Sequence, residues 1–303
     1  MDTLAQADSA ILMKRKQRQE MIQPYVFFMP AFILIAMISF IPLGYAIVQS
    51  FFRSDYLNLG SFVGFGNYYD YLISRNGLTS IINSIVFVVG TIIVAVPLGF
   101  GLALLLNQSF PFRGTIRTIL ILPWMVSNLV CGLLWAWLIN PQLGLVTVFF
   151  NWISLDIPNF ITNEYAAMAS VILASGWAQY PLVMVFVLSA LQTVSPELLE
   201  ASRIDGATAW QRFWKVIFPL VRNTTMLSLI LTTLHTFKNV EIILIMTGGG
   251  PNAKTETMAL RVFQEGFQFF RLGVGSAGAV IIFILNIIFA LAFIRILRSE
   301  HGA

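Results

Sequence analysis

Long apolar stretches alternate with short polar segments along most of this chain. A helix needs about 20 apolar residues to cross the hydrocarbon core of a bilayer, and six stretches meet that requirement. They lie at about 25–50, 81–107, 117–140, 166–192, 224–247 and 273–297. The pattern predicts an all-α polytopic membrane protein with six transmembrane helices, a polar tail at 1–22 and one membrane domain at 23–300.

The composition agrees with a membrane protein. Of the 303 residues, 57% are hydrophobic and 11% are charged, and the mean hydropathy is +0.80, which is more apolar than soluble domains are. The net charge of +4 comes from residues spread between the apolar stretches. Membrane topology therefore explains it better than nucleic-acid binding. The single cysteine, Cys131, excludes an intrachain disulfide.

The distribution of Lys and Arg predicts the orientation. If the N-terminus is cytoplasmic, twelve of these residues fall in cytoplasmic segments and five in outer segments. Basic residues are retained on the cytoplasmic side, so both termini are expected there. The first apolar stretch follows a basic cluster, is too long for a signal-peptide core and lacks a small-residue cleavage site, so we interpret it as an uncleaved anchor.

Two glycine-rich segments imitate nucleotide-binding motifs. From Gly248 the spacing of a phosphate-binding loop reaches Lys254 and Thr255, but Ala253 stands at its second glycine and no strand precedes it. The stretch 273–278, GVGSAG, fits a dinucleotide pattern but opens an apolar run. Small residues four apart, Gly273 with Ala277 and Gly275 with Ala279, favour close helix packing instead. We therefore expect no nucleotide site in this chain.

The segment 195–222, between the fourth and fifth apolar stretches, is predicted to be cytoplasmic. Ser195 followed by Pro196 is typical of a helix start. Asp205 and Gly206 predict a turn, and a second short helix is expected to end at Pro219. From composition alone, a docking element and an amphipathic helix at the membrane interface are equally acceptable.

This segment resembles the cytoplasmic loop signature of permease subunits in binding-protein-dependent ABC importers, E-A-A-x3-G-x9-I-x-L-P. Here the signature is Glu200-Ala201-Ser202, then Gly206, then the stretch VIFP at 216–219. The stretches FVGFGNYYDYL, RTILILPWMVSNLVCGLLWAWLINPQLGL and TGGGP are similar to the carbohydrate branch, of the maltose and glycerol-phosphate permease type. The likeness extends over nearly the whole chain beyond the tail and implies the type I importer permease fold.

The resemblance implies that the segment 195–222 couples the membrane domain to a separate ATPase. The residues implied to do so are Glu200, Ala201, Ser202, Asp205, Gly206 and Ala207. It also implies a second homologous permease, an ATPase dimer and an extracytoplasmic solute-binding protein as partners, in a bacterial cytoplasmic membrane. ATP and Mg would then bind the partner ATPase, and this chain would bind no cofactor.

Polar residues inside the apolar stretches are candidates for a cargo path. In the fifth stretch Thr232, Thr236 and Asn239 share one helical face beside His235, and in the fourth Ser175 and Gln179 are four residues apart. Such groups can hydrogen-bond the hydroxyls of a solute, but they also join helices in lipid. By resemblance, the positions of Ser175, Gln179, Thr232, Thr236 and Asn239 line the cargo path in the maltose-type relatives.

Lys238 and Glu241 are charged residues inside the fifth stretch. At positions i and i+3 they can pair on one helix face, alone or with the partner subunit. Alternatively, Lys238 faces the cavity and holds an anionic cargo. The first interpretation is preferred because an isolated charge in the bilayer is costly.

Three classes of function are compatible with a polytopic membrane protein. An enzyme would need a nucleophile with a base, or a metal cluster; only His235 and His301 are available, so no catalytic or metal residue is expected. A secondary transporter often shows internal repeats, and none is clear. The remaining interpretation is an importer permease for a sugar-like solute, such as a saccharide, glycoside, polyol, glycerol phosphate or sugar sulfonate. A non-sugar solute and a secondary transporter are the alternatives.

Overall fold

The computed structural model describes residues 2–54, 60–73, 76–154 and 159–299, and the side chains of all of these except 2–24, 26 and 296–299. Within this part of the chain there is no β-strand, and one isolated bridge pairs Phe52 with Phe62. The elements are α1 (Asp2–Gln49), α2 (Gly66–Ile73), α3 (Gly77–Leu106), α4 (Arg113–Met125), α5 (Asn128–Leu138), α6 (Leu145–Trp152), α7 (Glu164–Leu191), α8 (Pro196–Ile204), α9 (Ala209–Arg212), η1 (Phe213–Ile217), α10 (Phe218–Phe237), α11 (Glu241–Met246), α12 (Met258–Phe263), η2 (Gln264–Gln268) and α13 (Leu272–Ser299).

Most of the predicted spans coincide with one of these helices. Among the described residues, five helices are long and apolar enough to cross a membrane, or six if the bent pair α4 and α5 counts as one span. The first, second, fourth and sixth predicted stretches each match one such helix: Phe27–Gln49, Gly77–Leu106, Glu164–Leu191 and Leu272–Arg295. The prediction of an all-α polytopic membrane protein is confirmed. The third and fifth stretches are broken, which the prediction did not include.

Helices α3 and α7 pack against each other along their lengths, with α10 against both. Their backbones approach closely because glycines lie in the contact: a Cβ at Gly99 would lie 2.6 Å from the Tyr180 carbonyl oxygen. At Gly176 a Cβ would lie 2.5 Å from the Val94 side chain. The core here holds Phe100, Val183, Met184, Leu188 and Val221. These three helices form the rigid centre against which the other elements are placed.

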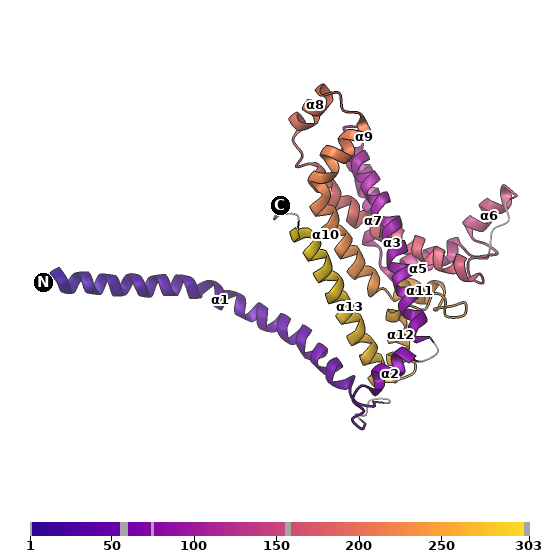
Figure 1. Cartoon of the computed structure of the whole chain (residues 1–303), viewed down its shortest axis with the longest axis horizontal. Coiled ribbons are helices and arrows are strands. Elements are labelled where there is room, and N and C mark those ends of the chain that lie inside the picture. The colour runs from indigo at the N-terminus through magenta and orange to yellow at the C-terminus, as the bar shows by residue number, and fades with distance from the viewer. Residues whose placement is uncertain (1, 55–59, 74–75, 155–158, 300–303) are drawn as a thin grey trace.

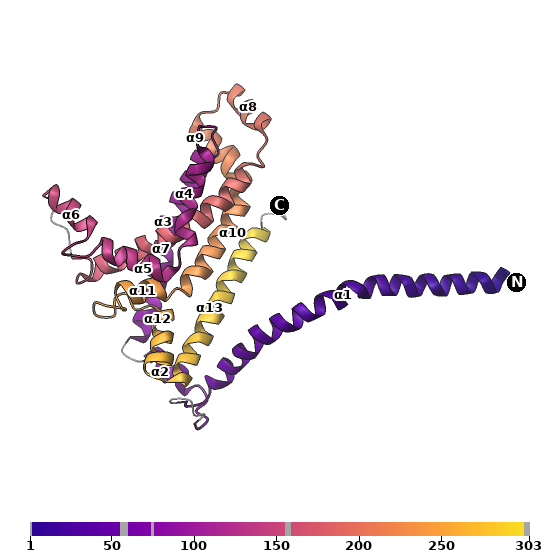
Figure 2. The same ribbon diagram turned by 180° about the vertical axis from the view of Figure 1, so that it is seen from behind.

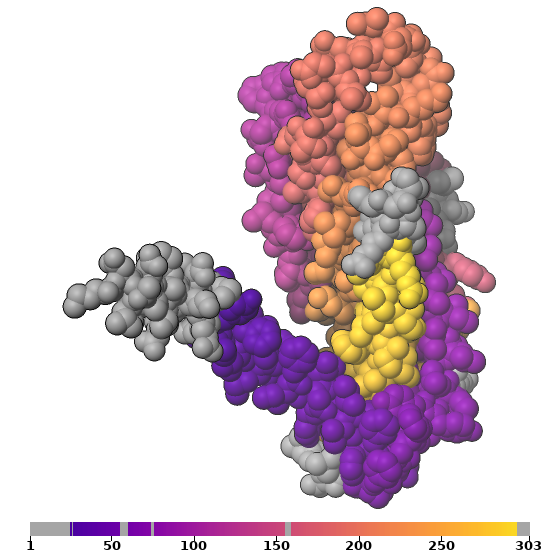
Figure 3. Space-filling view, turned by 60° about the vertical axis from the view of Figure 1, so that its left-hand side comes forward, coloured from indigo at the N-terminus to yellow at the C-terminus, as the bar shows by residue number. Residues whose placement is uncertain are grey.

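Helix α1 leaves this centre and runs away from it, as Figures 1 and 2 show. It is continuous across the boundary predicted between the polar tail and the membrane domain. Where α1 meets the rest of the chain it packs against α13, and Figure 3 shows the surface of its apolar half standing free. Phe27, Phe32, Ile38 and Phe40 are all exposed. An apolar surface of this length is covered by lipid or by another protein in the membrane.

The end of the bundle opposite α8 is formed by α2, α12, η2 and the start of α13 (Figure 1). Arg261 is buried there, with its guanidinium 4.6 Å from the centre of the Tyr71 ring and 3.8 Å from the Glu265 carboxylate. Glu265 also pairs with Arg271. Two arginines around one buried carboxylate balance the cost of removing it from water.

The loop 247–257, between α11 and α12, is held on α3. The amide nitrogen of Asn83 donates to the carbonyl oxygens of Ala253 (2.7 Å) and Glu256 (3.1 Å), and that of Asn76 donates to the Glu256 carboxylate. Burial raises the pKa of Glu256 above its ordinary value, although the bond from Asn76 lowers it. Helix α11 and not a strand precedes this loop, so it lacks the framework of a phosphate-binding loop.

The second glycine motif forms the first turns of α13. A Cβ at Gly273 would lie 2.4 Å from the carbonyl oxygen of Phe52, and one at Gly275 would lie 3.0 Å from the backbone nitrogen of Gly266. The prediction that these glycines serve close packing is confirmed. From this packed start, α13 runs toward the end of the bundle that carries α8 (Figure 1).

Candidate functional site

The third predicted span consists of two helices, α4 and α5, bent by 98°. Pro123 lies in the last turn of α4 and has no N–H to donate to the preceding turn. Val126 is extended, and the Ser127 hydroxyl then accepts a hydrogen bond from the backbone nitrogen of Val130 (3.4 Å), which starts α5. The span predicted over 117–140 is therefore present as a bent pair of helices, and the bend was not predicted.

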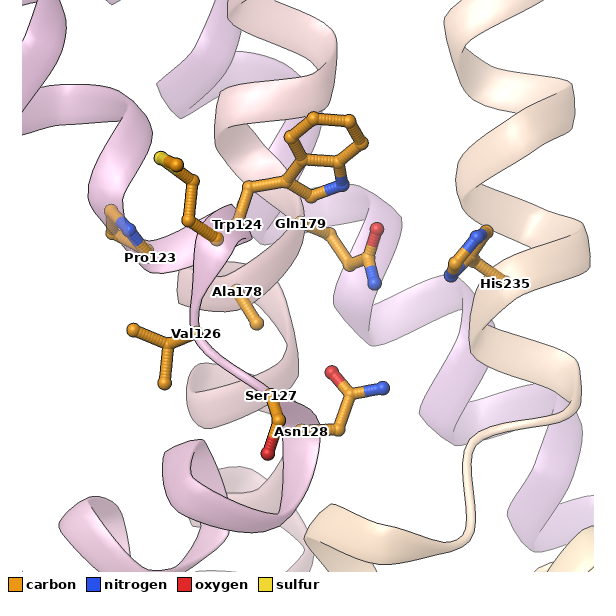
Figure 4. A pocket seen from close by; sticks show the side chains of 9 residues that line it. Pro123, Trp124, Val126, Ser127, Asn128, Ala178, Gln179 and His235 are labelled. Atoms are coloured by element: carbon orange, nitrogen blue, oxygen red, sulfur yellow. The ribbon is translucent and has the colours of Figure 1, made fainter.

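A cavity of about 280 Å³ lies at this bend, between α7 and α10. Figure 4 shows the carboxamide of Gln179, from α7, and the imidazole of His235, from α10, pointing toward each other, with the Asn128 carboxamide nearby. The lining residues are Pro123, Trp124, Met125, Val126, Ser127, Asn128, Ala178, Gln179 and His235. The cavity thus combines an aromatic wall with several hydrogen-bonding groups, and none of its described lining residues is acidic.

Four of the predicted cargo-path residues are buried and each has a polar atom without a hydrogen-bond partner within the described chain. These atoms are Ser175 Oγ, Gln179 Oε1, Thr232 Oγ1 and Asn239 Nδ2. A buried polar group without a partner costs about 1–3 kcal/mol, so groups of this kind are retained where another molecule can satisfy them. Thr91 Oγ1, on the adjacent α3, is a fifth such atom, and it was not among the predicted cargo-path residues.

The predicted residues do not all meet at one place. Gln179 and His235 line the cavity, whereas Ser175, Thr232 and Thr236 are buried and do not line it. The Thr236 hydroxyl is satisfied inside its own helix, by the carbonyl oxygen of Thr232 at 2.8 Å. The shared face predicted for Thr232, Thr236 and Asn239 does not reach Asn239, because α10 ends at Phe237.

The same helix end changes the interpretation of Lys238 and Glu241. Both side chains are exposed, and no ion pair joins them in the described chain. Lys238 caps α10 and Glu241 begins α11, with its carboxylate accepting from the Val240 backbone nitrogen at 3.3 Å. The predicted pairing on one helix face was wrong within this chain because the helix is interrupted between them. Pairing with another subunit stays a prediction.

The segment 195–222 lies at one extreme end of the bundle (Figure 1). Helix α8 begins at Pro196 as predicted, although the Ser195 hydroxyl makes no capping hydrogen bond. Gly206 has φ +77°, and the backbone nitrogens of Gly206 and Ala207 donate to the carbonyl oxygens of Arg203 (3.0 Å) and Ser202 (3.1 Å). These bonds close a tight turn that needs left-handed backbone at residue 206.

The six predicted coupling residues are all on the surface of this segment. Glu200, Ala201, Asp205 and Gly206 are exposed, and Ser202 and Ala207 are half-buried. The Ser202 hydroxyl donates to the carbonyl oxygen of Leu199. The Glu200 carboxylate makes no hydrogen bond with the described residues, so it is available to a partner.

The second helix of this segment was predicted to end at Pro219, but it continues past this residue. Thr208 and Gln211 form a capping box that starts α9. The helix then continues through η1, where the backbone nitrogen of Phe218 donates to the carbonyl oxygen of Phe213, into α10. Proline is tolerated at this point because it lies in the first turn of α10. The loop is thus joined to the fifth span without a break.

Residues 95–299 match the family described as binding-protein-dependent transport system inner membrane component. The chain is 35% identical to the sn-glycerol-3-phosphate transport system permease protein UgpA of Agrobacterium fabrum, over 88% of this chain and 91% of that protein. It is 28% identical to the trehalose transport system permease protein SugA of Mycobacterium tuberculosis, over 88% and 86%. Its fold is similar to a chain of a bacterial ABC transporter involved in the import of the acidic polysaccharide alginate, with a TM-score of 0.80 and 21% identity over 95% and 98%.

Proposed function

The chain belongs to the family of binding-protein-dependent transport system inner membrane components, as a sugar-type ABC importer permease, and from this premise we propose how it works. A sugar or sugar-like solute crosses the membrane beside the cavity at the α4–α5 bend. A separate ATPase supplies the energy by docking on the segment 195–222. The proposal includes cytoplasmic termini, a second homologous permease, an ATPase dimer that holds ATP and Mg, and an extracytoplasmic solute-binding protein.

The observation that carries the coupling proposal is the construction of the segment 195–222. It stands at the end of the bundle, its turn is fixed by Gly206, and it continues without interruption into α10. Helix α10 carries His235, one of the two predicted polar residues that line the cavity. A docked ATPase that displaces α8 and, through the turn at Gly206, α9 would therefore move a wall of the cavity, because α9, η1 and α10 form one uninterrupted helix that transmits motion as a rigid element.

The polar atoms without partners support the cavity as part of the cargo path. Solute hydroxyls both donate and accept hydrogen bonds. They can therefore bond first to one and then to the other of Gln179 and His235 as the helices shift. Trp124 adds the apolar surface that a sugar ring packs against. An outward- and an inward-facing state then differ in which end of this path is open to water.

ATP-driven uptake tests the proposal. The chain would be reconstituted with its partner permease, ATPase and loaded solute-binding protein, and the cargo identified by mass spectrometry of what the binding protein carries. Uptake should require all four components and ATP. Uphill transport by this chain alone would identify a secondary transporter, and a cargo without sugar-like chemistry would identify an importer of another solute.

The side of the membrane on which the coupling segment lies can be tested separately by cysteine labelling. The native Cys131 is buried, so it should not react with the reagent. Ile204 is 86% exposed on α8, and Tyr69 is 62% exposed on α2 at the opposite end. A membrane-impermeant thiol reagent should label Ile204→Cys only in inside-out vesicles and Tyr69→Cys only in right-side-out vesicles. The reverse pattern would refute the proposed coupling.

A further inference from the structure

The amino-terminal end of α5 opens into the cavity at the α4–α5 bend, and we propose that this end, together with Asn128 and His235, binds an anionic substituent of the cargo, such as a phosphate, sulfonate or carboxylate. This inference rests on the proposed function and names the class of its substrate. It follows from three observations: the backbone at the bend, a buried side chain without a partner, and the charges around the cavity.

The backbone at the bend has hydrogen-bond donors beside the cavity that no acceptor in the helix satisfies. Helix α5 has 11 residues, and its first two, Asn128 and Leu129, have N–H groups with no acceptor inside the helix. The Ser127 hydroxyl satisfies only the nitrogen of Val130. Val126, Ser127 and Asn128 line the cavity. The partial positive charge of a helix amino end favours an anion at such a position.

Gln179 supplies an independent indication that a ligand belongs here. Its side chain is 3% exposed and its carboxamide points toward His235 (Figure 4). Its Oε1 is buried without a hydrogen-bond partner and can only accept, so an anion would be held by the amide nitrogen. The amide nitrogen makes no hydrogen bond with the described residues either. His235 faces it and also has no hydrogen bond in the described chain. Two side chains that can donate thus converge on the space in front of the α5 amino end.

The charges near the cavity favour an anion over a cation. None of the lining side chains is acidic. Lys238 follows His235 by three residues at the end of α10 and forms no ion pair in the described chain. The nearest acidic residue along the chain, Glu241, belongs to the start of α11 and does not line the cavity. A neutral sugar could use the same donors, so the decisive property is a preference for charge.

The preference can be measured on the assembled importer in lipid nanodiscs, without the solute-binding protein. The probes are glucose 6-phosphate and glucose at matched ionic strength, and the readout is the half-saturating concentration for the rise in the thermal unfolding midpoint. Glucose 6-phosphate should half-saturate at a concentration about three to ten times lower than glucose.

Two variants localise the effect. Asn128→Asp keeps a residue that suits the first turn of a helix but adds a carboxylate where the anion would bind, so it should abolish the preference. Asn163→Asp makes the same change at the amino end of α7, where the side-chain oxygen caps the backbone nitrogens of Tyr165 and Ala166 away from the cavity. This control should keep the preference.

Equal half-saturation by the two probes, no shift with either probe, or a preference that survives in Asn128→Asp would overturn the inference. So would loss of the preference in Asn163→Asp. ATP-driven uptake separates this failure from failure of the proposed function. Uptake of a neutral cargo that Asn128→Asp leaves unchanged would refute only the anionic class, whereas absence of ATP-driven uptake by the complete wild-type importer would refute the proposed function itself.

Discussion

Gly206 offers a quantitative test of the coupling proposal. Its φ of +77° is left-handed, and a Cβ added there would meet no atom within 4 Å. The cost of a substitution is therefore conformational and not steric. For an L-residue this cost is about 1–2 kcal/mol, and it is larger for a β-branched side chain. Gly206→Val should thus reduce the population of the native turn at least about fivefold to thirtyfold.

The assay is ATPase activity stimulated by loaded solute-binding protein in the reconstituted importer. Gly206→Val should lose most of the stimulation, while Gly206→Asn should keep most of it because asparagine tolerates left-handed backbone. Gly114→Val is the control, since a Cβ at Gly114 also meets nothing within 4 Å and its φ is not left-handed. Full stimulation with Gly206→Val would refute the reasoning. Equal loss with valine and asparagine would point instead to a clash with the docked ATPase.

Three further predictions concern stability and transport. Thr232→Val should leave the unfolding midpoint unchanged or raise it, because Thr232 Oγ1 is buried without a partner. The same variant should lower ATP-driven uptake. A fall of several degrees in the unfolding midpoint would contradict this prediction. Asn83→Leu should lower stability by about 1–3 kcal/mol, because the carbonyl oxygens of Ala253 and Glu256 lose their donor, whereas the exposed Thr118→Val should change the midpoint little. Burial raises the pKa of Glu256 above 4.5, so the folded state binds this proton more tightly than the unfolded state does. The free energy of unfolding should therefore fall as the pH rises from 4.5 through the raised pKa. Glu256→Gln should flatten that part of the stability-pH profile, and an unchanged slope would contradict the assignment.

The apolar pattern predicted the membrane helices well because the length of an apolar run sets whether it can span a bilayer. It missed the two breaks for different reasons. Pro123 marks the end of one helix and Ser127 the start of the next. Both residues lie inside a long apolar stretch, so the hydropathy pattern did not show the break. The end of α10 has no proline or glycine near it, and its local mark is Asn239, whose Oδ1 accepts from the backbone nitrogen of Ile242 at the start of α11; the prediction assigned this asparagine to the cargo path instead.

The candidate site was predicted in part. Gln179 and His235 could be found because polar side chains in membrane helices are few and stand out. The contributions of Trp124 and Asn128 could not be found without the bend that turns them toward α7 and α10. Lys238 and Glu241 were paired by their spacing in a helix, and that spacing lost its meaning once the helix ended between them.

The π-helical segment η1, at Phe213–Ile217, has a consequence for comparing homologous chains. A π turn contains one residue more than the α-helix that would cover the same stretch. Nine residues separate Gly206 from Val216 in this chain, as in the signature of the family, so relatives that keep this spacing should also keep the extra residue of the π turn. Alignments in this family should therefore show no gap between 206 and 216, and a relative that is one residue shorter there should have a regular α-helix in place of η1.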